Sequence, residues 1–413
     1  MQNWKEIVRD NTAVDKIFCV ANSYYKTACT RQQDILHFKQ FLVEATRKPL
    51  FKIGCQQKSR VLFFYGIHHY RLDHMSAFEK VTSLVKPHDN IYPEKERQHW
   101  NLKYVAGSLY AFFLSIPYAL QHSWSLKKWM YFLSYWIQGY QTTVLLKSID
   151  LTKYRLVVVF CDTDTASNII VQQAQKVGCL TATVQHGMFM APREHPTIMD
   201  ETGAELLGFV SDYFLMWSEY AKEQAIKAGI PDEKIKVVGL PKFIGVISEP
   251  PIEKKNCFGV ILGWAENDEE NRRLINMANV IAQRTGARYY LKYHPSYREY
   301  VYDRLTNSTF CAGKVEKDIP LSEYVRMTDF SIVGNSSMFV ELSFLGQPVY
   351  HLHCDDLPDK YEDIKSISFS TPDELATLIS ESDAVNSVNN RNYLCGPLDP
   401  MTHYQNFFRE ILL

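Results

Sequence analysis

Several features that would assign this chain to a function class are missing from its sequence. Its 413 residues carry 45 basic and 46 acidic side chains, so the net charge of −1 offers no basic surface for nucleic acid. The opening residues, MQNWKEIVRD, contain no apolar stretch of the kind that a signal peptide needs, and we expect none here. Hydrophobic residues make up 46% of the chain, enough for two cores of ordinary size.

The nine cysteines follow no spacing pattern. Their number is odd, and no two of them form the CxxC pair that is typical of zinc ligands and redox thiols. This argues against a disulfide framework and against a cysteine zinc site. We therefore expect reduced thiols in a cytoplasmic setting.

Strand-like and helix-like runs alternate after a polar, helix-like stretch that ends near residue 58. Helix-like segments such as ASNIIVQQAQKVG separate several runs rich in β-branched and aromatic residues. Such alternation with short loops predicts a doubly wound parallel α/β sheet. The predicted strands of this first half are 60–66, 154–160, 179–187, 211–218 and 235–241.

A charged segment with two prolines, Ser248–Asn256, interrupts the alternation and is predicted to be a linker. We expect a first domain over 1–247, a second over 248–400 and a C-terminal helix over 401–413. Two Rossmann-like domains facing across a cleft are the simplest architecture, with ligands beyond the carboxyl ends of the strands. The second domain's predicted elements are strands at 257–264, 287–295, 329–335 and 347–352, and a helix from 372 to about 380.

Residues 101–147 form an aromatic-rich, helix-like insertion in the first domain. Its apolar run VAGSLYAFFLSIPYAL has 16 residues and contains Pro117, which is short of the roughly 20 residues that span a bilayer. We favour burial of these helices over the first sheet, because burial explains the aromatics without a partner. The alternative is peripheral contact with the inner face of the plasma membrane, since Lys127 and Lys128 lie among tryptophans.

Histidines and an acid follow two predicted strands of the first domain. His186 ends one strand, where Gly187 permits a sharp turn, and could serve as a general base for an acceptor hydroxyl or as a structural hydrogen-bonder. His68, Asp73 and His74 follow another strand and would line the acceptor side, with Asp73 as the alternative base. Their spacing fits no single helical face, so we expect no metal there.

The segment CDTD follows a third predicted strand. An Asp-x-Asp pair can hold a divalent ion, and Asp162 and Asp164 could do so on the acceptor side. The alternative is a cap for the helix that begins near Ala166. We favour the cap.

In the second domain, a polar turn leads into an apolar helix in GNSSMFVELSFLGQPVYHL. Ser336 or Ser337 is placed as the N-cap, so the N–H groups of the first turn would form an anion site. Glu341 lies one turn further, where a carboxylate can accept a hydrogen bond from a ribose hydroxyl. This pattern indicates a nucleotide, although an ordinary capped core helix would look similar.

Other polar groups of the predicted donor side lie at strand ends and turns. Lys292 and His294 would face a phosphate leaving group, and Pro295 would end their strand. Glu266 follows the first strand of the second domain, and Lys242 lies in a glycine turn near the domain junction.

The order of QHG, KYHP and TDFSIVGNSSMFVELSFLGQPV resembles the GT-B glycosyltransferase superfamily, and within it bacterial enzymes of capsule, teichoic-acid and lipooligosaccharide synthesis. The HP dipeptide and the paired serines are similar to motifs of bacterial sialyltransferases and of teichoic-acid polymerases. This resemblance implies that His294, Ser336 and Ser337 hold the donor phosphate, and the polymerases imply a catalytic role for His186. The polymerases run more directly through TDYSS, and this chain departs from them by the inserted GNS.

A second resemblance competes with the first. VVVFCDTDTASNII and VVGLPKF are similar to the GDTTT and TGNP segments of the non-hydrolysing UDP-N-acetylglucosamine 2-epimerases, which share the GT-B fold. The GGxxEE helix start of those enzymes appears here as SSMFVE, with one acid instead of two.

The resemblances imply a metal-independent glycosyltransferase without a cofactor. It would transfer a sugar from a nucleotide-activated donor, with a cytidine nucleotide favoured, to a surface-polysaccharide or lipid-linked acceptor. The alternatives are a CDP-glycerol or CDP-ribitol polyol-phosphate transferase, a UDP-sugar 2-epimerase-like enzyme, and a non-catalytic scaffold of a polysaccharide assembly complex.

Overall fold

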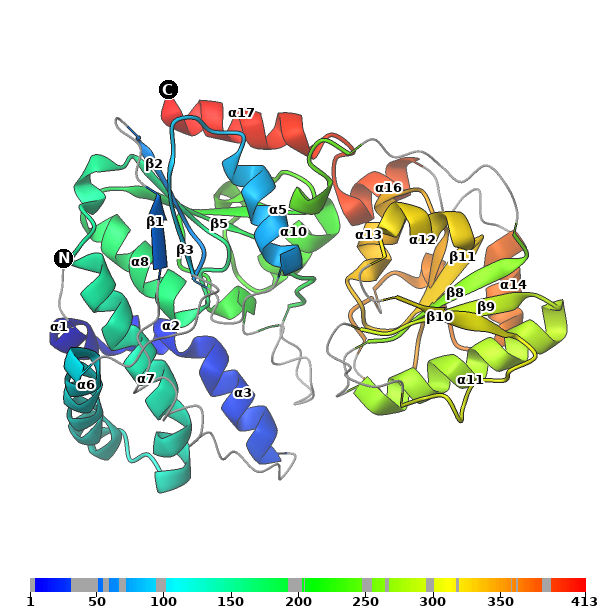
Figure 1. Cartoon of the computed structure of the whole chain (residues 1–413), viewed down its shortest axis with the longest axis horizontal. Helices are drawn as coiled ribbons and strands as arrows, with labels where there is room; N and C mark the ends of the chain where they lie inside the picture. Colours follow the sequence, from blue (N-terminus) through cyan, green and yellow to red (C-terminus); the bar gives the residue numbers. More distant parts are fainter. Residues whose placement is uncertain are drawn as a thin grey trace. The chain divides into compact units, whose positions relative to one another are not determined.

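Short apolar runs of the chain form the strands of two separate sheets in the computed structural model (Figure 1). One unit comprises Met1–Trp217, Lys222–Ile244 and Asp399–Leu413, and the other comprises Ser218–Ala221 and Gly245–Leu398. The structure describes residues 4–30, 51–54, 59–66, 72–93, 102–191, 203, 205–246, 255–263, 267–294, 301–316, 319–357, 359–361, 363–380 and 388–413.

The first unit contains a seven-stranded sheet in the order β1-β3-β2-β4-β5-β6-β7. All neighbouring strands are parallel except β1, which pairs antiparallel with β3 at the edge. The helix-like pattern expected up to residue 58 is therefore wrong at β1. The strands are β1 (Phe51–Gly54), β2 (Val61–Phe64), β3 (Asp89–Pro93), β4 (Leu156–Val159), β5 (Leu180–Val184), β6 (Tyr213–Met216) and β7 (Ile235–Val237).

Helices cover both faces of this sheet. Alternate residues of its strands point to opposite faces, so each strand contributes side chains to two cores. Leu62 and Phe64 pack into the core that α2, α7 and α8 share, whereas Val61 and Phe63 pack into the core beneath α5 and α17. The helices of this unit are α1 (Trp4–Val8), α2 (Asn11–Ile17), α3 (Cys19–Thr30), α5 (Leu72–Thr82), α6 (Leu102–Gln121), α7 (Leu126–Leu146), α8 (Thr165–Lys176) and α17 (Pro400–Leu412). A further helix, α10 (Glu219–Lys227), has its first three residues in the second unit and the rest in the first.

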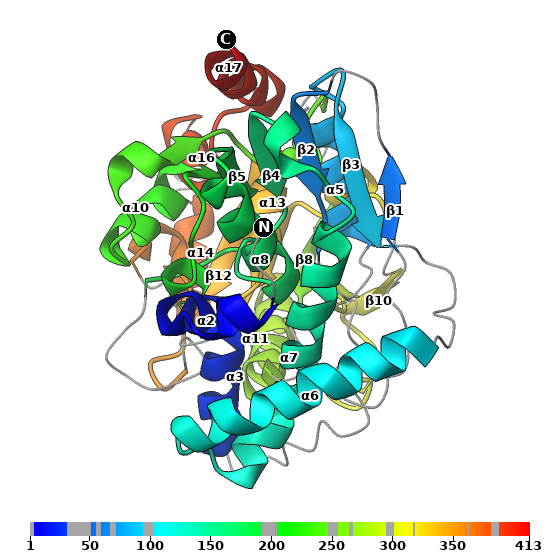
Figure 2. The same cartoon turned by 90° about the vertical axis from the view of Figure 1, so that its left-hand side faces the viewer.

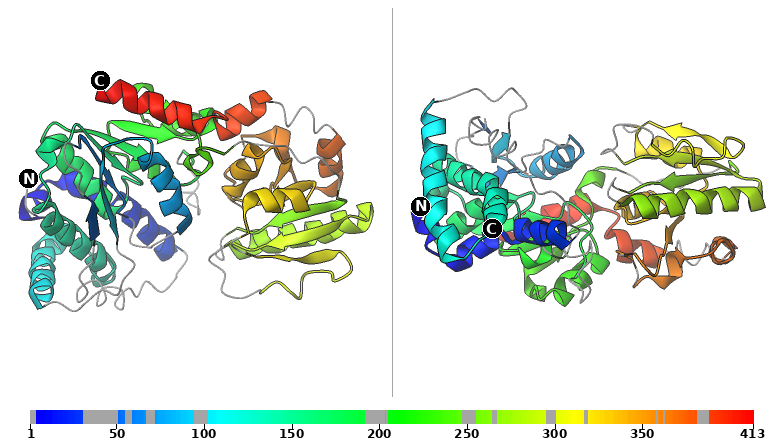
Figure 3. Two further views of the ribbon diagram at one scale, coloured as in Figure 1. Left: turned by 45° about the horizontal axis from the view of Figure 1, so that its top comes forward. Right: turned by 90° about the horizontal axis from the view of Figure 1, so that it is seen from below.

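The C-terminal helix α17, drawn red in Figure 3, belongs to this first unit. Tyr404, Phe407, Phe408 and Ile411 recur every three or four positions and are buried against the sheet. The last residues of the chain thus complete the core that begins with β2.

The aromatic insertion forms the helices α6 and α7, as predicted. α7 packs against α8 and buries Tyr131, Phe132 and Trp136, whereas α6 packs against α7 on the outside of the unit (Figure 2). Burial therefore accounts for the aromatics of α7 but not for all of α6. No helix among the described residues combines the length and the hydrophobicity needed to cross a membrane.

The second unit contains a six-stranded, all-parallel sheet in the order β10-β9-β8-β11-β12-β13. Counted along the chain, this is the Rossmann order 3-2-1-4-5-6. The strands are β8 (Cys257–Ile261), β9 (Arg288–Lys292), β10 (Cys311–Val315), β11 (Phe330–Val333), β12 (Val349–Leu352) and β13 (Ser368–Phe369). The helices are α11 (Asp268–Thr285), α12 (Leu321–Met327), α13 (Met338–Phe344), α14 (Pro372–Ser380) and α16 (Val388–Cys395).

The predicted doubly wound α/β architecture is confirmed in both units. Each sheet also has a point where the chain reverses the direction in which it adds strands: between β2 and β4 in the first unit, and between β8 and β11 in the second. Loops diverge at such a switch point, and ligands of open α/β sheets bind beyond the carboxyl ends of the strands there. The candidate sites therefore lie at these two points.

Candidate functional site

At the first switch point, the segments that follow β2 and β4 approach closely. A Cβ atom at Gly66 would lie 2.7 Å from Ser167 Oγ and 2.9 Å from Asp164 Oδ2 at the start of α8. Only glycine leaves room for this approach.

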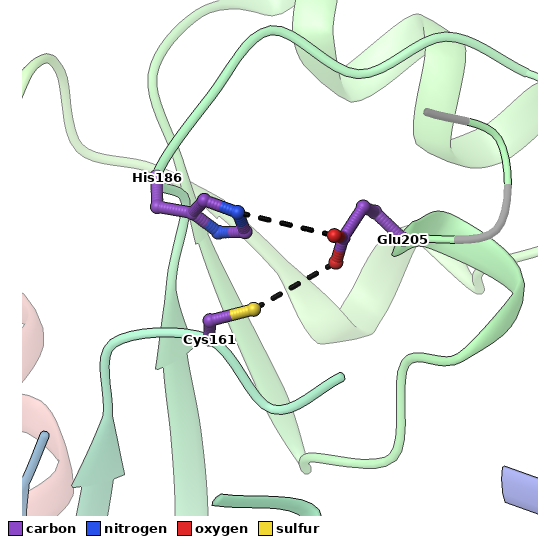
Figure 4. A group of neighbouring side chains, drawn as sticks. All are labelled: Cys161, His186 and Glu205. Carbon is purple, nitrogen blue, oxygen red and sulfur yellow. Dashed lines mark hydrogen bonds and ion pairs between the residues drawn. The ribbon is translucent and has the colours of Figure 1, made fainter. Parts of the chain in front are cut away.

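Three side chains converge beyond the ends of β4 and β5 (Figure 4). His186 Nε2 lies 4.0 Å from Glu205 Oε1, and Cys161 Sγ lies 3.7 Å from Glu205 Oε2. The Thr163 hydroxyl donates a hydrogen bond to the same carboxylate. His186 and Glu205 are only 19% and 15% exposed, so water screens their interaction weakly.

The Cys161 thiol of this group is buried. Burial, followed by the nearby charge of Glu205, raises the pKa of the Cys161 thiol well above its usual range, so the thiol stays protonated at neutral pH. Glu205 lies at ion-pair distance from the His186 imidazole, so the carboxylate is placed to orient the ring.

The same three residues could hold a metal ion. In the described part of the chain, Cys161, His186 and Glu205 each offer one ligand atom, and these atoms lie within 4.8 Å of one another. A Zn²⁺ ion takes such sulfur, nitrogen and oxygen ligands at about 2.0 to 2.3 Å. It would have to displace the thiol proton.

The two aspartates of the CDTD segment have structural roles. The Asp162 carboxylate accepts hydrogen bonds from the N–H groups of Val210 at 3.0 Å and Ser211 at 2.9 Å, and burial raises its pKa to about 6. Asp164 is the N-cap of α8 and accepts a bond from the Ser167 N–H at 3.3 Å. The predicted cap is thus confirmed.

Of the expected acceptor-side residues, the structure brings His74 to the site. Its ring centroid lies 6.0 Å from that of His186 and 5.3 Å from that of Phe160. The half-exposed Asp73 carboxylate lies 3.9 Å from His74 Nε2. His68 lies outside the described residues.

At the second switch point, a buried carboxylate joins the loops that follow β8 and β11. Glu270, from the first turn of α11, is 5% exposed, and its Oε1 accepts bonds from the Asn335 N–H at 3.0 Å and from Asn335 Nδ2 at 2.8 Å. A Cβ at Gly334 would lie 2.5 Å from the Glu270 carboxyl carbon. Burial raises the pKa of Glu270 to about 7, against the lowering effect of the Asn335 N–H.

The paired serines lie in the loop beside this carboxylate. Ser337 occupies the N-cap position of α13 but makes no capping bond, whereas Ser336 Oγ accepts a bond from the Met338 N–H at 3.3 Å. The Tyr361 hydroxyl donates to the Ser336 carbonyl at 2.8 Å and so holds the turn in place. Glu341 lies in the first turn of α13, as predicted.

The remaining donor-side residues are spread over several places. His294 follows the end of β9 and is partly buried, whereas Lys292 is 5% exposed and its ammonium donates to the Glu316 carbonyl at 3.3 Å. Lys242 belongs to the first unit, and its carbonyl accepts a bond from Lys80 Nζ at 2.6 Å. Glu266 and Pro295 lie outside the described residues.

Sequence reasoning missed Glu205, Cys161, Glu270 and Asn335. Glu270 belongs to the run DEENRR, whose charged residues are typical of a solvent-exposed helix N-terminus. Its immediate neighbour Glu269 follows that pattern, because it is exposed and pairs with Arg273 at 2.9 Å. Periodicity could have distinguished the two carboxylates, because Glu270 falls on the same face of α11 as the buried Leu274 and Ala278, whereas Glu269 falls outside it.

Comparison with known proteins gives matches at the level of fold. No protein-family model and no curated protein sequence matches the chain. The UDP-GlcNAc 2-epimerase from Neisseria meningitidis bound to UDP-GlcNAc is similar with a TM-score of 0.50 and 15% identity, over 85% of this chain and 99% of that one. The UDP-N-acetylglucosamine 2-epimerase from Rickettsia bellii is similar with a TM-score of 0.50 and 13% identity, over 86% and 96%.

A structure of the wall teichoic acid polymerase TagF, the H444N variant with CDPG, matches with a TM-score of 0.44 and 13% identity over 97% of each chain. Together with the two Rossmann-like sheets described above, the epimerase structures show the fold: this chain has a GT-B-type fold.

Proposed function

We propose that this chain is a glycosyltransferase that takes a sugar from a nucleotide-activated donor, preferentially a cytidine nucleotide, and transfers it to a surface-polysaccharide or lipid-linked acceptor. The observation that carries the proposal is that polar and titratable side chains gather beyond the carboxyl ends of strands at or next to the switch point of each sheet. His186 and Glu205 do so in the first unit, and Glu270 and Asn335 in the second.

The second unit has the features of a donor-binding unit. Its sheet has the strand order of dinucleotide-binding folds, and the loop after β11 is a turn of small polar residues that are buried or half-buried. We assign His294, Ser336 and Ser337 to the donor phosphate and Glu341 to the ribose hydroxyls. Glu270 fixes the loop through Asn335 and so sets the position of the serines.

The first unit supplies the base. The acceptor hydroxyl gives its proton to His186 Nε2 while its oxygen forms a bond to the anomeric carbon of the sugar. The nucleotide leaves with the electrons of the bond that breaks. Glu205 stabilises the imidazolium that forms, and general-base assistance of this kind contributes about 10²- to 10⁴-fold to a rate. We propose that no metal takes part.

Binding is tested by the thermal stability of the purified protein with CMP, CDP, UMP, UDP, GDP and ADP, with and without magnesium. A ligand that binds only the folded state raises the melting temperature. We expect CMP or CDP to do so without magnesium. No shift with any nucleotide would refute the proposed donor site.

The product that the protein forms then distinguishes the possible reactions. Transfer from a CMP-sugar to a glycan acceptor supports the proposal. Incorporation of polyol phosphate from CDP-glycerol would replace it with a polyol-phosphate transferase, and interconversion of UDP-GlcNAc with its 2-epimer would replace it with an epimerase. Nucleotide binding without any turnover would indicate a scaffold.

A further inference from the structure

One face of α6 is both apolar and exposed. Leu102, Leu109, Phe113 and Leu120 are 87%, 54%, 63% and 75% exposed. Their spacing of seven, four and seven residues places them within about 20° of one line along the helix, at 100° per residue. They form a continuous stripe on the outside of the first unit, where Figure 2 shows α6 in front of α7.

The opposite face of α6 already packs against the rest of the unit. Ser108, Ala111, Ser115 and Tyr118 are buried, and Ser115 Oγ accepts a hydrogen bond from Trp129 Nε1 of α7 at 2.9 Å. A helix on the surface of a protein in water normally turns a polar face outward, whereas α6 turns out a second apolar one. The stripe therefore fits an apolar surrounding better than it fits water.

The charged residues near α6 indicate the kind of surface to which its apolar stripe binds. Residues 102–149 contain four lysines and no aspartate or glutamate. Lys127 follows the exposed Leu126 at the start of α7, and Lys128 Nζ lies 5.2 Å from the centre of the Trp124 ring. Lysines and tryptophans beside an apolar stripe are typical of helices that lie in the headgroup region of an anionic bilayer.

We infer that α6 and the start of α7 dock on the surface of an anionic phospholipid membrane. The stripe of α6 enters the boundary between headgroups and acyl chains, and Lys127 and Lys128 contact lipid phosphates. A bilayer accounts both for the apolar stripe and for the absence of acidic residues between positions 102 and 149. The inference goes beyond the proposed function and does not depend on the identity of the donor.

The test is flotation of the full chain with vesicles of phosphatidylcholine and phosphatidylglycerol, against vesicles of phosphatidylcholine alone. We expect binding to the anionic vesicles that weakens with salt. L109S/F113S is expected to lower the partition coefficient about 100-fold, about tenfold for each large apolar side chain withdrawn. K127E/K128E is expected to remove the preference for phosphatidylglycerol.

Two matched controls are available. Val280→Ser removes an exposed apolar side chain of α11, and Lys227→Glu reverses an exposed charge on α10; both are expected to float like the unchanged protein. Circular dichroism confirms that each variant folds, and its thermal shift with nucleotide tests the proposed donor site separately.

Three outcomes would overturn the inference. The first is an unchanged protein that stays unbound with anionic vesicles. The second is an L109S/F113S variant that floats as well as the unchanged protein. The third is a dimer by light scattering that L109S/F113S converts to a monomer without effect on flotation, because the stripe would then be covered by a second copy.

Discussion

Replacing Glu270 by glutamine should make the protein more stable at neutral pH and should flatten the pH dependence of its stability. The folded protein keeps the Glu270 proton up to about pH 7, whereas an unfolded chain loses it near pH 4.5. Between these values the folded state binds more protons, so the free energy of unfolding falls as pH rises. This contribution is fully present below pH 4.5 and is lost as pH rises through about 7.

The magnitude follows from the two pKa values. A rise from 4.5 to about 7 corresponds to about 3 kcal/mol, since one pH unit is worth about 1.4 kcal/mol. Glutamine resembles the protonated carboxyl, and its oxygen can still accept the two hydrogen bonds from Asn335. We therefore expect the stability difference between E270Q and the unchanged protein to grow by about 3 kcal/mol from pH 4.5 to pH 8.

The assay is urea unfolding at a series of pH values. Pulse labelling by hydrogen exchange, at one fixed pH, follows the unfolding of the peptides that contain β8 and β11. It thereby identifies the unfolding transition that belongs to the second unit. Glu269→Gln is the matched control, because Glu269 is exposed on the same helix turn and its pair with Arg273 is worth less than about 1 kcal/mol. Parallel stability curves for E270Q and the unchanged protein would refute the reasoning.

Four further predictions concern the candidate sites of the two units. His186→Gln is expected to lower turnover about 10²- to 10⁴-fold while the nucleotide thermal shift stays unchanged; a matching loss of the shift would contradict the base role. His294→Ala is expected to remove both the nucleotide shift and turnover, and full activity would exclude this histidine from the donor site. Gly334→Ala places a methyl group 2.5 Å from the Glu270 carboxyl carbon and should cost about 1–3 kcal/mol in urea unfolding, whereas G187A, with its nearest atom at 3.5 Å, should cost less. Treatment with a chelator is expected to leave turnover unchanged, and a loss that Zn²⁺ restores would assign a metal to the cysteine–histidine–glutamate group of the first unit.

Most strands were predictable from sequence, including β7 at the edge of the first sheet, whereas β1, β3, β10 and β13 were not. β2 and β4 are continuous apolar runs, and β5, β8 and β11 are mainly apolar with a few small residues, because helices cover both sides of each sheet. β3 reads DNIYP and β10 reads CAGKV, with proline, aspartate or glycine in short segments. Such strands lack the apolar pattern because one side or one edge is less covered.

The candidate site was only partly predictable for a similar reason. His186, His294 and the paired serines could be named in advance, because each follows a strand and the carboxyl ends of parallel strands are where ligands bind. Lys292 also follows this rule, yet its ammonium points to the Glu316 carbonyl. A position at a strand end does not fix the direction of a long side chain.

The sequence by itself determined the alternation of strands and helices, and hence the two doubly wound sheets and the strand ends that carry His186, His294, Ser336 and Ser337. Tertiary structure alone decided which acids among many join these ends. Glu205 lies 19 residues from His186 along the chain, and Glu270 lies 65 residues from Asn335. Local periodicity places Glu270 on the apolar face of α11, but which loop its carboxylate contacts depends on where neighbouring elements pack, which no local pattern encodes.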